Sequence, residues 1–219
     1  HAWRTQRAAN DWSGFLENFR PVLKLAREEA QLLAADSGLS RYDALVDLYE
    51  PGMRGAELER IFAEIKTWLP DLVIRVAARQ ANEKVVMPTG PFPIVNQRAL
   101  CQDVMRLLDF NFDAGRLDES AHPFSGGVPE DVRMTTRYRA DEFVQSLMGT
   151  IHETGHARFE QNLPREWLGM PIGQARSFGV HESQSLSYEM QLARSRGFIG
   201  LLSPMVVRHL GDQPAFEAG

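Results

Sequence analysis

The chain has 219 residues, of which 43% are hydrophobic and 24% charged, and its formal net charge is −5. This length allows one substantial domain or two small ones, and the mild acidity argues against a dedicated nucleic-acid binder, which usually carries a basic patch. No apolar run approaches the roughly 20 residues that a membrane-spanning helix needs, and no signal peptide heads the chain, so no membrane partner is expected.

The cysteine content points to a reducing compartment. Cys101 is the single cysteine of the sequence, which rules out an internal disulfide framework. We therefore expect a cytoplasmic protein in which Cys101 is a small helix residue rather than a nucleophile.

The first half of the chain predicts helices separated by proline and glycine. Residues 2–35 form one long amphipathic pattern that Pro21 interrupts, so we expect a kink or two helices meeting near Phe19–Arg20. Further helices are predicted over 41–53, ended by Pro51-Gly52, and over 54–80, where Pro70 forces a break or restart. A proline-rich loop at 88–95 precedes helical spacing over 96–110.

The second half introduces one strand among helices. After a segment at 111–130 rich in Gly, Pro, Asp and Ser, the residues at 131–138 favour a strand, which could pair with an extended peptide. Helices are predicted over 141–162, over 179–197 and in a last apolar segment, and Phe124, Trp167 and Tyr188 are expected in the core. The fold class is mainly α, a helical fold with a small antiparallel β element beside the helix predicted over 141–162.

The stretch IHETGHARFE, residues 151–160, contains the strongest chemical signal. It reads His-Glu-x-x-His, which places His152 and His156 one turn apart on the same face of a helix, where two imidazoles can share a metal. Glu153 points beside the metal, where a general base belongs. A chain of this length has odds of roughly one per cent of containing the motif by chance, in which case the two histidines would simply lie on a surface helix.

The surroundings of the motif favour the metal interpretation. Phe143, Leu147 and Ile151 recur at i, i+4 and i+8, as on the buried face of a helix. Gly155 costs about 1 kcal/mol against Ala inside a helix. It would let another segment approach the site closely, and the alternative is that it is incidental.

A catalytic zinc usually takes three protein ligands, so a second element must supply the third. The best donor segment is HESQSLSYE, residues 181–189, in which Glu182 shares an otherwise apolar helical stripe with Glu189. His181 points about 100° away from it. Spacing alone does not choose among Glu182, His181 and Glu189, and Glu182 could also be a solvated acid near the positive end of a helix dipole.

Five segments together are similar to the M32 metallocarboxypeptidases, the carboxypeptidase Taq family. They are HETGH at 152–156, HESQS at 181–185, YDALVDLYEPG at 42–52, HPFSGG at 122–127 and DVRMTTRY at 131–138. The resemblance implies a mostly helical peptidase with a deep groove, often a homodimer. It also implies that His152, His156 and Glu182 hold the metal and that Glu153 is the base.

The sequence departs from the family in length. Family members are about twice as long and carry two further motifs downstream of the third ligand, so residues 1–219 are expected to form a single partial domain, the central segment of a longer catalytic domain. Its terminal helices, for example FIGLLSPMVV, should then expose apolar faces. The alternative function is a truncated, catalytically inactive helical fragment that binds metal or a partner.

The expected activity is removal of C-terminal residues from peptide substrates by a zinc-dependent carboxypeptidase, with cobalt also suited to such a site. Arg133 and Arg137 are candidates for binding the substrate's carboxylate, because a guanidinium can hold a carboxylate through two hydrogen bonds. His122 could add a hydrogen bond. For Arg133, a salt bridge to Asp131 is nearly as good an interpretation.

Overall fold

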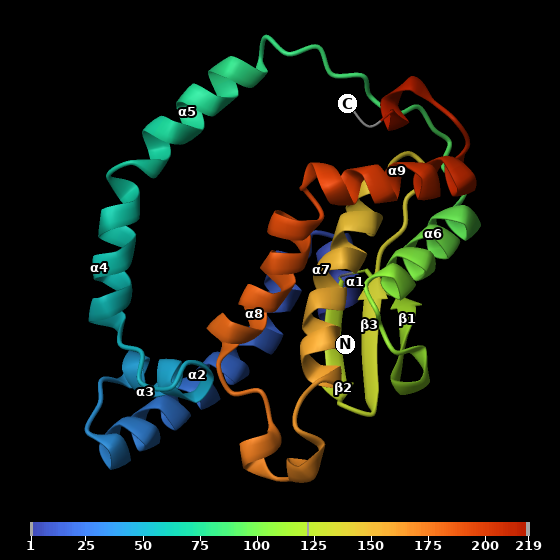
Figure 1. Cartoon of the computed structure of the whole chain (residues 1–219). Coiled ribbons are helices and arrows are strands. Elements are labelled where there is room, and N and C mark those ends of the chain that lie inside the picture. The colour runs from blue at the N-terminus through green and yellow to red at the C-terminus, as the bar shows by residue number, and fades with distance from the viewer. Residues whose placement is uncertain (1, 122, 218–219) are drawn as a thin grey trace. The chain divides into compact units, whose positions relative to one another are not determined.

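The structure is a computed structural model that describes residues 2–121 and 123–217. The chain separates into two compact units, which comprise the residues up to Ala81 and the residues from Asn82 onward (Figure 1). Helices dominate both units, as predicted. Among the described residues, no helix combines the length and the apolar character needed to cross a bilayer.

The first unit consists of helices joined by short connections: α1 (Ala2–Ala8), α2 (Trp12–Ser37), α3 (Arg41–Tyr49), α4 (Gly55–Lys66) and α5 (Leu69–Gln80). Pro70 lies in the first turn of α5, where its missing N–H has no helical partner to lose. The predicted restart at Pro70 and the predicted helix end before Pro51 are therefore confirmed.

The predicted meeting of two helices near Pro21 is wrong, because α2 runs through Pro21 as one helix. The alternative, a kink at this point, stays a prediction. The chain breaks earlier, where Asn10 has a φ of 53° and the Asp11 carboxylate accepts a hydrogen bond of 2.9 Å from the amide of Gly14. Asn tolerates positive φ better than most residues, and an Asp cap satisfies an amide that no helical carbonyl can reach. Local polar chemistry thus sets this boundary.

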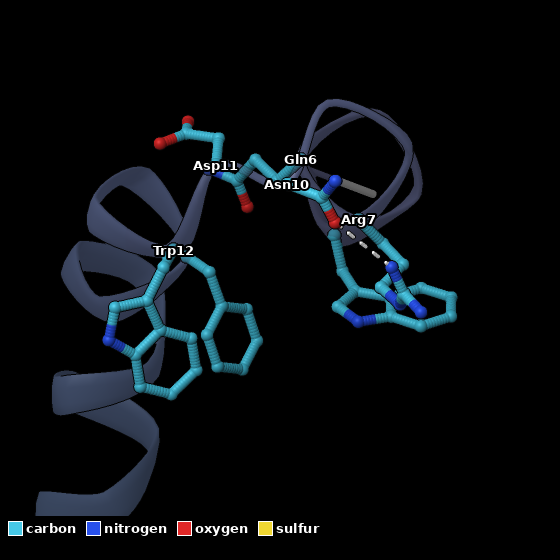
Figure 2. A pocket seen from close by; sticks show the side chains of 7 residues that line it. Gln6, Arg7, Asn10, Asp11 and Trp12 are labelled. Carbon is cyan, nitrogen blue, oxygen red and sulfur yellow. Dashed lines mark hydrogen bonds between the residues drawn. The ribbon is translucent and has the colours of Figure 1, made fainter.

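A hollow of about 400 Å³ lies at the junction of α1 and α2 (Figure 2). Its lining includes Arg7, which donates a hydrogen bond of 3.3 Å to Asn10, and Trp12, whose ring stacks on Phe15 with centroids 5.4 Å apart. The acid in the lining, Asp11, already caps α2. The hollow therefore follows from helix packing and offers no uncommitted carboxylate for catalysis.

The second unit contains the sheet and the HEXXH helix. Its main elements are α6 (Ile94–Leu107), β1 (Gly115–Glu119), β2 (Phe124–Val128), β3 (Asp131–Thr136), α7 (Val144–Gln161), α8 (Phe178–Leu186) and α9 (Arg196–Leu210). Single 3-10 turns lie at η1 (Phe112–Ala114), η2 (Arg165–Trp167), η3 (Pro171–Gly173) and η5 (Pro214–Phe216). A π-helical segment, η4 (Ser187–Leu192), follows α8 directly.

The three strands form a mixed sheet in the order β1-β3-β2. The expected antiparallel pairing is that of β2 with β3, whereas β1 pairs with β3 in parallel. Since β3 has a neighbour on each side, the idea that this strand receives an extended peptide is wrong. The sheet lies against α7, whose other side contacts α8 (Figure 1).

The core of the second unit lies where α6, α7 and α9 meet. Val104 of α6 and Ile151 of α7 are fully buried, and Leu147 and Leu202 belong to the same cluster. Burying a side chain of this kind stabilises the fold by about 1.5–3 kcal/mol. This packing anchors the helix that carries the HEXXH motif.

Two aromatic side chains expected in the core are exposed. Phe124 is 51% exposed at the start of the edge strand β2, and Trp167 is 42% exposed in the turn η2, whereas Tyr188 packs partly buried against the core. The expected apolar face of the last helix is found only in part. Phe198 of α9 is buried, but Leu201 is 56% exposed.

Gly155 allows α7 and α8 to touch through their backbones. A Cβ at position 155 would lie 2.6 Å from Cα of Ser185 and 2.7 Å from the carbonyl oxygen of Gln184. Real Cβ atoms essentially never approach backbone atoms this closely, so any side chain at this position must push the helices apart. The predicted close approach of another segment at Gly155 is confirmed.

We predict opposite effects for two glycine substitutions in α7. Helix propensity favours Ala over Gly by about 1 kcal/mol at both Gly149 and Gly155. Gly149→Ala should raise the free energy of unfolding by this amount, because a Cβ there meets nothing within 4 Å. Gly155→Ala should instead lower it by about 1–3 kcal/mol, because the added Cβ overpacks the contact with α8. Chemical denaturation measures both, and equal stabilisation by the two changes would contradict the helix contact.

Candidate metal centre

Helix α7 carries both histidines of the HEXXH motif on the side that faces α8. The helix begins after Glu142, whose carboxylate accepts a hydrogen bond of 2.9 Å from the amide of Gln145. The side chains of His152 and His156 are 21% and 16% exposed, and their ring centroids lie 5.0 Å apart. The four-residue spacing thus brings the two imidazoles together, as predicted.

Glu182 of α8 reaches the same point from the opposite helix. Its Oε2 lies 3.2 Å from Nε2 of His156, and its Oε1 lies 3.8 Å from Nε2 of His152. The potential ligand atoms of these three residues all lie within 4.8 Å of one another. Both imidazoles therefore turn their Nε2 atoms toward a single carboxylate.

This donor set fits a divalent metal. Two imidazole nitrogens and one carboxylate are a ligand combination of catalytic zinc sites, which keep a further position open for water or substrate. The Glu182 side chain is 50% exposed, so the cluster has an accessible side.

On its Nδ1 side, His152 contacts Glu189 of η4. The distance from Nδ1 to Oε2 of Glu189 is 3.0 Å, and Arg194 donates to the other carboxylate oxygen at 3.2 Å. Because a carboxylate accepts hydrogen bonds, the imidazole donates here through Nδ1–H, which leaves a lone pair on Nε2. Such a partner fixes the orientation of a metal-binding histidine.

On its Nδ1 side, His156 contacts another histidine. Its Nδ1 lies 2.7 Å from Nδ1 of His181, and Nε2 of His181 lies 2.8 Å from Oε1 of Glu160. The ring of Phe159 packs edge-on against His181, with centroids 5.1 Å apart. His181 is thus held by neighbours on α7.

The three residues that spacing left open as third ligand all lie at the site, in different positions. Glu182 faces the two Nε2 atoms, whereas Glu189 and His181 face the Nδ1 atoms behind them. The contact of Glu160 was missed by the sequence reasoning. Its position four residues after His156, on the same helix face, could have revealed it.

Burial lowers the pKa of His156 below its usual range. The largest cause is desolvation, followed by repulsion from His181 and His152, and the Glu182 carboxylate opposes these effects. A lowered pKa keeps the imidazole neutral near pH 7. The neutral imidazole is the form that can coordinate a metal.

Glu153 follows His152 in sequence and is not one of the three residues whose potential ligand atoms converge. It is 7% exposed on α7, between the histidines in sequence. A buried carboxylate beside a metal centre has the surroundings that general bases have in hydrolytic enzymes. Cys101, in contrast, is buried in the core, and burial raises the pKa of its thiol to about 11, which disfavours the nucleophilic thiolate.

The predicted carboxylate-binding residues have local partners. Arg133 is exposed and binds Asp131 with Nε and Nη2 at 2.7 to 3.2 Å, so the salt-bridge interpretation holds for it. Arg137 is also exposed and donates one hydrogen bond of 3.2 Å to Gln145. The third candidate, His122, lies outside the described residues.

Curated proteins similar to this chain are carboxypeptidases. It is 42% identical over 221 residues to thermostable carboxypeptidase 1 of Thermus thermophilus, which covers 96% of this chain and 43% of that protein. It is 38% identical over 200 residues to carboxypeptidase 1 of Bacillus subtilis, over 90% of this chain and 39% of that protein. The chain thus spans about two fifths of the length of these relatives.

Solved structures agree. Metallocarboxypeptidase 1 of Trypanosoma cruzi matches with a TM-score of 0.87 and 50% identity, over 99% of this chain and 44% of that one. Carboxypeptidase of Pyrococcus furiosus matches with a TM-score of 0.80 and 30% identity, over 95% and 42% respectively. The model of the family described as carboxypeptidase Taq (M32) metallopeptidase matches residues 1–216. The chain therefore belongs to the carboxypeptidase Taq (M32) metallopeptidase family.

Proposed function

We propose that the protein is a zinc-dependent carboxypeptidase that hydrolyses C-terminal residues from peptides. The observation that carries the proposal is the convergence of His152, His156 and Glu182 beside the buried Glu153. Membership of a metallopeptidase family and the carboxypeptidase relatives support it. Because the chain spans about two fifths of those relatives, the activity is proposed for the full-length protein, for which a cytoplasmic homodimer stays a prediction.

The proposed metal ligands are Nε2 of His152, Nε2 of His156 and a carboxylate oxygen of Glu182. Zinc suits this mixed nitrogen and oxygen set, and cobalt suits it as well. A divalent metal held there would polarise the scissile carbonyl and acidify a water molecule.

Glu153 is proposed to be the general base. Its carboxylate would accept a proton from the attacking water and pass it to the amine that leaves. Burial supports this role, since a carboxylate shielded from bulk water exchanges protons with its immediate neighbours.

Arg137 is the better of the two candidate arginines for binding the free carboxylate of the substrate. The guanidinium of Arg133 is occupied by two hydrogen bonds from Nε and one from Nη2 to the Asp131 carboxylate, whereas Arg137 has a single hydrogen bond to the amide oxygen of Gln145. A substrate carboxylate could replace an amide oxygen more readily than a paired carboxylate.

The overall activity is tested by metal analysis combined with digestion of two peptides of the same sequence, one with a free C-terminus and one with an amidated C-terminus. The full-length protein should contain zinc in stoichiometric amount, release the last residue of a peptide with a free C-terminus, and leave its C-terminally amidated form intact. Cleavage inside both peptides would show an endopeptidase. Stoichiometric zinc without release of any residue would favour the inactive alternative.

Replacement of the third ligand should remove the metal. We predict that Glu182→Ala in the full-length protein lowers zinc occupancy after dialysis as severely as His156→Ala, because each removes one of three ligands. Ser183→Ala is the matched control on α8, since its hydroxyl bonds the Val180 carbonyl and not the cluster. Full zinc retention by Glu182→Ala would show that another residue is the third ligand.

Replacement of the base should spare the metal. Glu153→Gln keeps the size of the side chain but cannot accept a proton, so we predict near-normal zinc content and a kcat lowered by roughly 10²–10⁴-fold or more, with KM changed less. Steady-state kinetics and metal analysis check this prediction. Full activity would remove the base assignment, and zinc loss would make Glu153 a ligand or a support of the site.

The arginines should differ in their effect on substrate affinity. Arg137→Ala is expected to raise KM for peptides with a free C-terminus by roughly 10–100-fold, the range for losing a hydrogen-bonded charge. Arg133→Ala, which frees only Asp131, should leave KM nearly unchanged. A larger effect at Arg133 would reverse the assignment.

A further inference from the structure

His181 connects a proposed metal ligand, His156, to the partly buried carboxylate of Glu160. Its two ring nitrogens are both used, Nδ1 against Nδ1 of His156 at 2.7 Å and Nε2 against Oε1 of Glu160 at 2.8 Å. The side chains of His181 and Glu160 are 22% and 20% exposed, so water competes weakly for these contacts. The three residues form one connected chain of hydrogen bonds.

The chemistry of the groups fixes the direction of that chain. The Glu160 carboxylate accepts, so Nε2 of His181 carries a proton, and in the neutral ring Nδ1 of His181 is then an acceptor. Nδ1 of His156 must therefore donate to it. Nε2 of His156 is left with a lone pair 3.2 Å from the Glu182 carboxylate. Two acceptors face each other there, so this direction suits the site when the proposed cation lies between them.

The reverse direction is unfavourable for a metal site. It would place a lone pair of neutral His181 against the Glu160 carboxylate and a proton on Nε2 of His156, where the proposed ion needs a lone pair. The other histidine needs no such relay, because Glu189 contacts Nδ1 of His152 directly at 3.0 Å.

We propose that His181 and Glu160 are positioning residues that hold His156 in its Nδ1–H tautomer and so present Nε2 to the metal. The inference rests on the proposed metal site. It adds residues that orient the ligand His156 through Nδ1, the ring nitrogen that does not face the metal. For this role, residue 181 must place a hydrogen-bond acceptor where Nδ1 of His181 lies. Another side chain that places an acceptor there should serve as well as the imidazole ring.

The test measures zinc affinity of the full-length protein by competition with a chelator. His181→Ala should weaken zinc binding by roughly 10–100-fold, the range for losing the hydrogen-bond partner of a metal-binding histidine. His181→Asn should stay within about threefold of the parent, because its side-chain oxygen can accept from Nδ1–H. Glu160→Ala should weaken binding, whereas Glu166→Ala, an exposed acid of η2, should not.

A spectroscopic measurement supplies a second readout that needs no metal. In histidine-selective ¹⁵N NMR of the metal-free protein at mildly alkaline pH, the tautomer of His156 reflects a balance between two acceptors. His181 accepts from Nδ1–H, and the Glu182 carboxylate, 3.2 Å from Nε2, accepts from Nε2–H. His181→Ala should move this tautomer balance toward Nε2–H, and His181→Asn should restore it.

The outcomes separate the relay from the site itself. Unchanged zinc affinity in His181→Ala, or a loss in His181→Asn as large as in His181→Ala, would overturn the relay while the metal site stands. Undiminished zinc affinity in His156→Ala would overturn the proposed site and the relay with it. A tautomer balance of His156 that is the same in the parent and in His181→Ala would overturn the relay alone.

Discussion

The backbone contact between α7 and α8 at Gly155 is the constraint on which the rest of the site depends. Only a residue without a side chain leaves room for Ser185 and Gln184 at this distance. Because α8 lies so close, the Glu182 carboxylate reaches Nε2 of His156 at 3.2 Å and Nε2 of His152 at 3.8 Å.

The site collects an unusual density of ionisable groups within a small volume. Three histidines and the carboxylates of Glu153, Glu160, Glu182 and Glu189 lie on α7, α8 and η4. Buried ionisable groups cost free energy unless they are paired. Here His152 lies between Glu182 and Glu189, and the linked pair of His156 and His181 lies between Glu182 and Glu160.

The sequence allowed the main features of the site to be predicted, because the HEXXH spacing is a property of a single helix. The residues that require two elements were harder to assign. Glu182, His181 and Glu189 could not be ranked, since distances along one helix do not say which side chain faces another helix. Glu160 was overlooked although it lies on the motif helix, because its contact runs through His181.

Features of the fold that depend on neighbouring residues in sequence were likewise easier to predict than features that depend on contacts between distant segments. The helix ends near Pro51 and Pro70 follow from the chemistry of proline. The break between α1 and α2 instead depends on the turn at Asn10 and Asp11, which the sequence analysis overlooked in favour of Pro21. The strands β1 and β2 lie in a segment rich in turn-forming residues. These strands form because they pair with β3, and that pairing cannot be predicted from the residues of the segment itself.

The π-helical segment η4, which follows α8 directly, changes the direction in which later side chains project. Glu182 lies in α8, before this change, and Glu189 lies within η4. An α-helix turns by 100° per residue, and a π turn accommodates one residue more than an α turn. Deleting a single residue between Ser187 and Glu189 would convert the segment to regular helix and rotate Glu189 away from His152, while Glu182 kept its place. The regular part of this chain segment thus carries Glu182 and the π-helical part carries Glu189, so the angle at which Glu189 meets His152 depends on the π turn.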